Sequence, residues 1–197
     1  MPHEARLLAA LGRQSGASSD YDLNGGLGLP SERNLRAAAV LVAIWDCNGG
    51  AHVVLTKRAS HLKHHPGQIA FPGGKIEDSD QGPEAAALRE AQEETGLDPG
   101  AVQVLGTLAP HQTVTGFMVT PVVARIHAAF DPRPDPSEVE EVFAVPLSHV
   151  LDPGRYRVEG RQWRGQLRRY YTVPWGPYYI WGATARILYG LAQRVAG

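Results

Sequence analysis

Three glutamates at helical spacing are the side chains of this sequence best suited to chemistry. Glu90, Glu93 and Glu94 stand at i, i+3 and i+4 of the run PEAAALREAQEET, so on a helix their carboxylates share one face. Like charges at this spacing destabilise a helix by about 0.2–0.5 kcal/mol per pair unless a cation lies between them. Mg²⁺ prefers carboxylate, water and phosphate oxygens as ligands. The cluster therefore predicts a site for a metal that is bound to a phosphorylated ligand.

A glycine-rich segment, Pro72-Gly73-Gly74, precedes this predicted helix. Glycine has no side chain, so its backbone carbonyl or amide can approach a metal or a phosphate closely. Taken alone, the three glutamates are more typical of a solvated acidic helix face, on which Arg89 would pair with Glu93 at i+4. The residues around the cluster favour the metal site.

The segment from Gly73 to Leu97 resembles the signature of the Nudix hydrolases, G-x5-E-x7-R-E-U-x-E-E-x-G-U, in which U is a bulky apolar residue. Ala91 is a small occupant of one U position. Several fixed residues recur at fixed spacings, which makes the resemblance specific. The residues that fit the pattern are Gly74, Arg89, Glu90, Glu93, Glu94, Gly96 and Leu97.

One position departs from that signature. After five intervening residues Gly74 is followed by Asp80 where the family has glutamate, and eight residues instead of seven separate Asp80 from Arg89. The extra residue leaves Asp80, Glu77 and Glu84 as alternatives for the first acidic position. The three glutamates of the helix are unaffected by this choice.

The resemblance implies an α/β fold, the Nudix-type α/β/α sandwich with a mixed sheet between helices. It also implies that Glu90 and Glu94, helped by Glu93 and the Gly74 carbonyl, hold Mg²⁺ or Mn²⁺. Such a metal lowers the pKa of a bound water, which then attacks phosphorus. Glu93 and Arg89 count among the implied catalytic residues, and Arg89 is expected to orient a motif carboxylate.

A basic run at residues 55–74 lies directly before the signature. It resembles the extra motif of the coenzyme A pyrophosphatase branch of the family, L-L-T-x-R-[SA]-x3-R-x3-G-x3-F-P-G-G. Lys63 stands where that motif has arginine, and lysine keeps the charge but loses the bidentate fork. Its cationic or titratable side chains include Arg58, His61, Lys63, His64 and His65.

This second resemblance implies hydrolysis of coenzyme A and its derivatives to 3′,5′-ADP and 4′-phosphopantetheine. A basic loop suits such a substrate, because charge-assisted hydrogen bonds can hold phosphates beyond the two that are separated. The residues expected to contact the substrate are Arg58, Lys63, His64, Gly73 and Gly74. A zinc site built from the histidines lacks the usual accompanying ligands.

The reaction also needs a group that accepts a proton from the attacking water. Glu138, Glu140 and Glu141 follow the proline-rich loop Asp131–Pro136. A carboxylate on a loop that faces the metal suits this role, and we choose Glu138 as the general base.

Two other functions remain open on the sequence. One is a Nudix hydrolase for another nucleoside diphosphate derivative, such as ADP-ribose or a dinucleotide. The other is a catalytically silent Nudix domain that binds nucleotides or RNA. The intact glutamate cluster argues against the second, because a binding domain has no need of three crowded carboxylates.

Composition is ordinary for a globular protein. The 197 residues are 43% hydrophobic and carry a formal net charge of -1, which gives no support for a nucleic-acid partner. The single cysteine, Cys47, cannot form an internal disulfide, and the longest apolar run, Ala37–Trp45, is too short to span a bilayer. We expect a cytoplasmic enzyme with a small-molecule substrate and no membrane partner, and we leave a homodimer open.

The elements that must position these residues follow from hydrophobic periodicity and turn residues. An N-terminal helix at 4–14 and a loop at 15–34 are expected to precede a Nudix domain at 35–197. Asn48-Gly49 predicts a hairpin turn. Residues 59–74 are predicted to be a loop, and the interleaved basic and aromatic residues of 155–171 fit an exposed hairpin or, less well, a single-strand binder. Helices are predicted at 83–95 and 182–195, and strands at 37–45, 52–58, 102–108, 118–126, 142–147 and 168–173.

Overall fold

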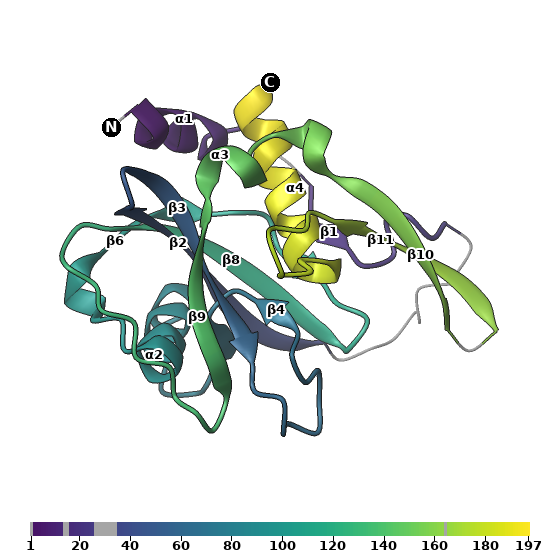
Figure 1. The fold of residues 1–197 in the computed structure, drawn as a ribbon, viewed down its shortest axis with the longest axis horizontal. Coiled ribbons are helices and arrows are strands. Elements are labelled where there is room, and N and C mark those ends of the chain that lie inside the picture. Colours follow the sequence, from purple (N-terminus) through teal and green to yellow (C-terminus); the bar gives the residue numbers. More distant parts are fainter. Residues whose placement is uncertain (1, 14–15, 26–34, 164) are drawn as a thin grey trace.

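The structure is a computed structural model that describes residues 2–13, 16–25, 35–163 and 165–197 (Figure 1). Its helices are α1 (Pro2–Leu11), α2 (Pro83–Thr95), α3 (Leu147–Val150) and α4 (Gly182–Ala196). Its strands are β1 (Ser18–Ser19), β2 (Arg36–Cys47), β3 (Gly50–Arg58), β4 (Ile69–Ala70), β5 (Gly73–Lys75), β6 (Val102–Thr107), β7 (His111–Gln112), β8 (Phe117–Ile126), β9 (Val139–Pro146), β10 (Arg157–Trp163) and β11 (Gln166–Thr172).

A mixed sheet forms the centre of the molecule. β2 pairs with β8 in parallel and with β3 in antiparallel orientation, and β9 continues the sheet beyond β3. The short strand β5 pairs with the N-terminal half of β2, which places Gly73 opposite Val40. β10 and β11 form a separate two-stranded hairpin that extends away from the sheet (Figure 1).

The two faces of the sheet bury different sets of side chains. Along β2, Val42 and Ile44 pack with residues of α1 and α4, whereas Leu41 and Ala43 pack with residues of α2. Successive residues of a strand point to opposite faces, so this alternation covers both faces with helices. The predicted α/β/α sandwich with a mixed sheet is therefore confirmed.

The contact between α2 and the sheet is made largely by alanines. Ala86, Ala87 and Ala91 are fully buried against Ala39 and Leu41 of β2. Small side chains allow the helix backbone to approach the sheet closely. This explains why Ala91 occupies a position where the Nudix signature has a bulky apolar residue.

Most of the predicted elements are confirmed. α2 has the predicted bounds, and the two-residue turn at Asn48 and Gly49 has positive φ at both positions, as a primed hairpin turn requires. The exposed hairpin expected within 155–171 is present as β10 and β11. No helix among the described residues has the length and hydrophobicity needed to cross a bilayer.

Other predicted bounds are wrong. The N-terminal helix ends at Leu11, since glycine, a poor helix former, follows at position 12. Residues 59–74 were predicted as loop, but they contain β4 and part of β5, whose pairing with β3 and β2 depends on contacts distant in sequence. Within the predicted linker, β1 pairs with β7, and residues 26–34 lie outside the described part of the chain.

The N-terminal segment is attached to the core at two places. Leu7 of α1 is buried in the same apolar cluster as α4. Further along, the fully buried ring of His111 is hydrogen-bonded to the Ser18 hydroxyl (2.9 Å) and the Asp20 carboxylate (3.1 Å). The predicted division of the chain at residue 34 stays a prediction.

Candidate active site

The acidic face of α2 is positioned by local sequence signals. Pro83 begins the helix, where its missing N–H is harmless, and Gly96 ends it in the left-handed conformation (φ 73°), with its N–H bonded to the Gln92 carbonyl. These two residues fix which carboxylates face the sheet. Glu94 is only 4% exposed, and its Oε2 accepts a hydrogen bond from the Gly73 N–H at 3.1 Å.

Burial strongly affects the acidity of two α2 carboxylates. The pKa of Glu94 is raised to about 8: desolvation is the main cause and the charge of Glu90 adds to it, while the Gly73 N–H and Arg58 act in the opposite direction. Desolvation also raises the pKa of Glu90, against the effect of Arg89. The charge of Glu138 contributes to both increases. An added cation would favour the ionised forms of these carboxylates.

Gly74 creates the space into which Glu90 projects. A Cβ at position 74 would lie 2.4 Å from Oε1 of Glu90, so any other residue would displace that carboxylate from its position. A Cβ at position 73 would lie 2.4 Å from the Ala39 carbonyl oxygen of β2. The two glycines therefore serve different purposes: Gly73 allows strand pairing and Gly74 leaves room for the acid.

The donor set fits a hard divalent cation. Glu90 and Glu94 supply carboxylate oxygens in a partly desolvated position next to backbone without side chains, which is a setting that Mg²⁺ and Mn²⁺ accept together with waters and substrate phosphates. Across the described residues, no three acidic, histidine or cysteine side chains converge as a ready ligand group. Glu93 was predicted to join Glu90 and Glu94 in the metal site. Its exposed carboxylate instead accepts a hydrogen bond from Arg89 at 3.1 Å.

Arg89 is the centre of a hydrogen-bond network behind these acids. Its Nε and Nη2 donate to the two carboxylate oxygens of Asp80, each at 3.0 Å, and its Nη1 donates to Glu90 and to Glu93, each at 3.1 Å. Nη2 also donates to the Lys75 carbonyl. The bidentate pair lowers the pKa of Asp80 and raises that of Arg89.

In this network Asp80, one of the three alternatives for the first acidic position of the signature, is the partner of Arg89. The choice among Asp80, Glu77 and Glu84 for that position stays a prediction. The carboxylate of Asp80 is 5% exposed and also accepts the Glu77 N–H at 2.8 Å. The Arg89–Glu93 pair expected for a solvated helix face is also present. Both interpretations of the acidic face therefore hold in part: its outer edge is solvated and its inner edge is buried.

The basic run divides into residues near the acids and residues away from them. The Arg58 guanidinium lies close enough to lower the pKa of Glu94. Lys63 and His64 are exposed in the loop before β4, and their expected substrate contacts stay predictions. His61 is hydrogen-bonded to the Ser137 carbonyl oxygen at 3.2 Å.

Among the three acids considered as general base, Glu138 is the one whose charge acts on both Glu90 and Glu94. It precedes β9 in an exposed turn, and its carbonyl oxygen accepts the Ala59 N–H at 2.8 Å, which holds it beside the end of β3. Glu140 and Glu141, expected on a loop, lie in β9. Glu140 binds Lys57 at 2.7 Å, and Glu141 accepts the Tyr178 hydroxyl at 2.5 Å.

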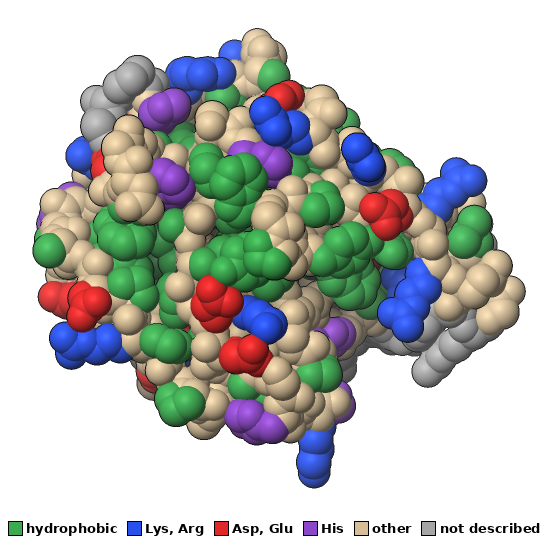
Figure 2. All heavy atoms as spheres, in the orientation of Figure 1, with side chains coloured by type: hydrophobic (Ala, Val, Ile, Leu, Met, Phe, Trp, Pro, Cys, Tyr) green, Lys and Arg blue, Asp and Glu red, His purple; other side chains and the backbone are tan. Residues whose placement is uncertain are grey.

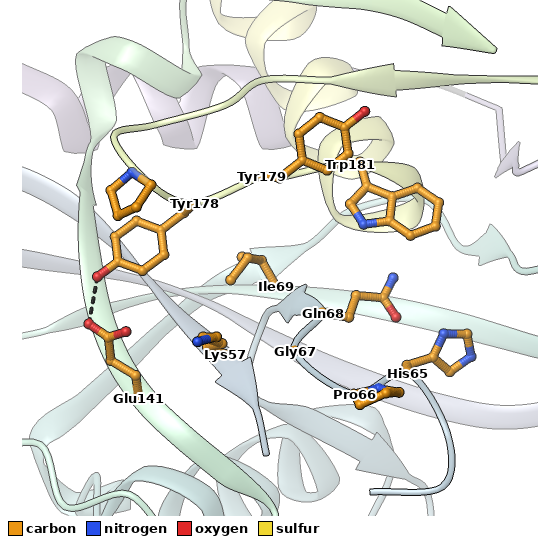
Figure 3. Close-up of a pocket in the computed structure, with 11 residues that line it drawn as sticks. Lys57, His65, Pro66, Gly67, Gln68, Ile69, Glu141, Tyr178, Tyr179 and Trp181 are labelled. Carbon is orange, nitrogen blue, oxygen red and sulfur yellow. Dashed lines mark hydrogen bonds between the residues drawn. The ribbon is translucent and has the colours of Figure 1, made fainter. Parts of the chain in front are cut away.

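A neighbouring cavity of about 390 Å³ was not anticipated from the sequence. Figure 3 shows Tyr178 and Lys57 on one side of it and Trp181 and Gln68 on the other. On the surface, hydrophobic side chains gather near the middle of the same face (Figure 2). The signal in the sequence was the run Tyr178-Tyr179-Ile180-Trp181, three aromatic residues around one buried isoleucine.

Comparison with known proteins agrees with the fold. A family model described as NUDIX domain matches residues 35–165. Proteins named Uncharacterized Nudix hydrolase NudL, from Salmonella paratyphi B and Salmonella newport, are 44% identical over 162 residues, which is 82% of this chain and 84% of theirs. The chain therefore belongs to the Nudix hydrolase family, whose members generally use divalent metals and act on small nucleotide derivatives.

One solved structure supports the same fold. A MutT/nudix family protein from Enterococcus faecalis has a TM-score of 0.51 at 17% identity, covering 86% of this chain and 65% of the other. The Nudix hydrolase RenU from M. smegmatis has a TM-score of 0.49 at 29% identity, covering 58% of this chain and 73% of the other.

Substitution of the two glycines separates their roles. We expect Gly73→Ala to lower the free energy of unfolding by at least about 1–3 kcal/mol, because φ is 153° and the new Cβ would meet the backbone of β2. Gly74→Ala should cost less than about 1 kcal/mol, since only the end of the Glu90 side chain must move. Urea unfolding measures both, with Gly50→Ala, which meets no atom within 4 Å, as control. Equal losses at 73 and 74 would contradict this assignment.

The raised pKa of Glu94 predicts a pH-dependent stability in the absence of metal. Its folded-state pKa of about 8 lies above the ordinary value of 4.5, so the stability that the protonated group contributes is present below pH 4.5 and is lost as pH rises through 8. In urea unfolding with a chelator, Glu94→Gln should gain stability relative to the native chain between pH 5 and pH 8.5. Glu84→Gln, exposed on the same helix, is the control. A pH-independent difference for Glu94→Gln would refute the shift.

Proposed function

We propose that this protein hydrolyses the pyrophosphate bond of coenzyme A and its derivatives, in the presence of Mg²⁺ or Mn²⁺, to 3′,5′-ADP and 4′-phosphopantetheine. The observation that carries the proposal is the position of Arg58. This arginine, from the run that resembles the coenzyme A pyrophosphatase motif, lies in electrostatic contact with Glu94. A basic group beside the carboxylates that would hold the metal is suited to the phosphates of a diphosphate linkage.

The roles of the acids follow from their positions. Glu90 and Glu94, with the exposed Glu93 and the Gly74 carbonyl, would hold the cation, which when bound neutralises phosphate charge and lowers the pKa of a coordinated water. Arg89 keeps Glu90 in place through the bridge to Asp80.

The remaining groups act on the substrate and on the water. Arg58 would donate to the diphosphate, and the Gly73–Gly74 backbone would lie against it without interference from side chains. Glu138, whose charge reaches Glu90 and Glu94, would accept the proton of the attacking water. Because it is exposed before β9, its carboxylate is accessible to solvent and substrate.

Removal of one buried carboxylate tests the chemistry. We expect Glu94→Gln to lower kcat for coenzyme A by at least about 10²-fold, since the amide cannot replace the charge that a cation requires. The reaction is run with Mg²⁺ or Mn²⁺ and, separately, with a chelator, and the release of 3′,5′-ADP is measured by chromatography. The control variant Glu84→Gln should retain full activity. Undiminished activity of Glu94→Gln would invalidate the metal assignment.

The same assay on a panel of substrates tests the choice of coenzyme A. Turnover of ADP-ribose or of a dinucleotide without turnover of coenzyme A would replace the proposed substrate and leave the α2 chemistry intact. Mass spectrometry of the products formed in ¹⁸O-labelled water identifies the phosphorus that is attacked.

Arg58 offers a test that does not involve the metal ligands. Loss of a charged hydrogen bond costs about 1.5–3 kcal/mol, so Arg58→Ala should lower kcat/KM for coenzyme A by about 10- to 150-fold, with partial recovery in Arg58→Lys. Steady-state kinetics measure the effect, and Arg157→Ala, in the exposed hairpin, is the matched control for loss of an arginine. An unchanged kcat/KM in Arg58→Ala would remove the support for the basic run.

A further inference from the structure

The cavity beside β3 and β4 has a composition that the metal chemistry does not require. Its volume is about 390 Å³, and its walls combine the aromatic rings of Tyr178, Tyr179 and Trp181 with the amide of Gln68 (Figure 3). We propose that this cavity is the site for the nucleobase of the substrate, with Trp181 as stacking surface and Gln68 as the group that reads the edge of the base. The inference rests on the proposed function and specifies which half of the substrate lies here.

The cavity adjoins the acids through Arg58 and the segment that follows it. Arg58 ends β3 directly after Lys57, which lines the cavity, and its charge acts on Glu94 of α2. The Arg58 N–H donates to the Gln68 carbonyl at 3.0 Å. From Gln68 the chain needs five residues to reach Gly73, at most about 17 Å of extended backbone. One nucleotide can therefore contact both sites.

The aromatic walls are held in place before any ligand binds. Tyr178 stacks on Phe143 at a centroid distance of 3.6 Å, and its hydroxyl donates to Glu141. The Tyr179 hydroxyl donates to Glu159 at 2.7 Å. Rings that are fixed in this way lose little conformational entropy on binding, which favours a flat, rigid ligand.

Two further observations concern Trp181 and Gln68. The Trp181 ring meets Tyr170 in an edge contact at 5.1 Å and lines the cavity. The side-chain amide of Gln68 is hydrogen-bonded to no other described residue, so its donor and acceptor are available to a ligand. A side-chain amide pairs with the N6 and N7 positions of adenine in a bidentate manner. The flexible, non-aromatic pantetheine chain has no flat ring to stack on Trp181.

Product binding in the absence of metal tests the inference without relying on catalysis. Titration calorimetry with chelator present would measure the affinities of 3′,5′-ADP and of 4′-phosphopantetheine for the native chain, Trp181→Ala and the matched control Trp181→Phe. Stacking of one base on an aromatic side chain corresponds to about 5- to 150-fold in affinity. We expect Trp181→Ala to lose this factor for 3′,5′-ADP alone, and Trp181→Phe to retain most of the affinity.

Gln68→Ala provides a second variant that removes no ring. It should reduce the preference for 3′,5′-ADP over its guanine counterpart by about 5- to 150-fold, because the amide no longer distinguishes the two bases. Unchanged binding of 3′,5′-ADP by Trp181→Ala, or weaker binding of 4′-phosphopantetheine instead, would overturn the assignment.

The two proposals fail in different ways. If the native chain hydrolyses coenzyme A but Trp181→Ala binds 3′,5′-ADP normally, the nucleobase site is wrong and the proposed function stands. If coenzyme A is not hydrolysed while 3′,5′-ADP binding depends on Trp181, the substrate is wrong and the nucleobase site stands.

Discussion

The burial of two acids from one helix is the constraint on which the site depends. Glu94 is nearly inaccessible to water and Glu90 is half-buried, and the Glu94 carboxylate accepts a hydrogen bond from the Gly73 N–H. Burying a charge is unfavourable unless it is paired or hydrogen-bonded. The Gly73 amide compensates part of this cost, and Arg89 compensates another part through Glu90. The part that stays uncompensated would be offset by a bound cation of the kind proposed above.

The rest of the architecture supplies the geometry that this burial demands. The alanine contact allows α2 to lie close to the sheet, and β5 presents its two glycines to the acids from the edge of β2. Asp80 is placed to hold both nitrogen positions of the Arg89 fork. Each of these elements is needed because a carboxylate in the protein interior is destabilising unless hydrogen-bond donors are held next to it in a fixed geometry.

Sequence reasoning succeeded where signals are local and failed where partners come from distant segments. Pro83 and Gly96 fixed the bounds of α2, since both act within one turn of the helix. Spacing could not predict that Asp80 pairs with Arg89, because this pairing depends on how a loop folds back on Arg89. The strand β4 and the cavity beside it were missed for the same reason: Tyr178 and Gln68 are far apart in sequence and meet only through tertiary packing.

The irregular pairing of β3 with β9 has an implication for divergence within the family. The register shifts between Lys57 and Arg58, and these adjacent residues serve different neighbours, the first lining the aromatic cavity and the second approaching the acids of α2. Changes in the cavity wall can therefore accumulate without disturbing the residues beside the acids of α2. A protein with this arrangement can change the ligand that its cavity binds while the acids of α2 and their neighbours stay the same.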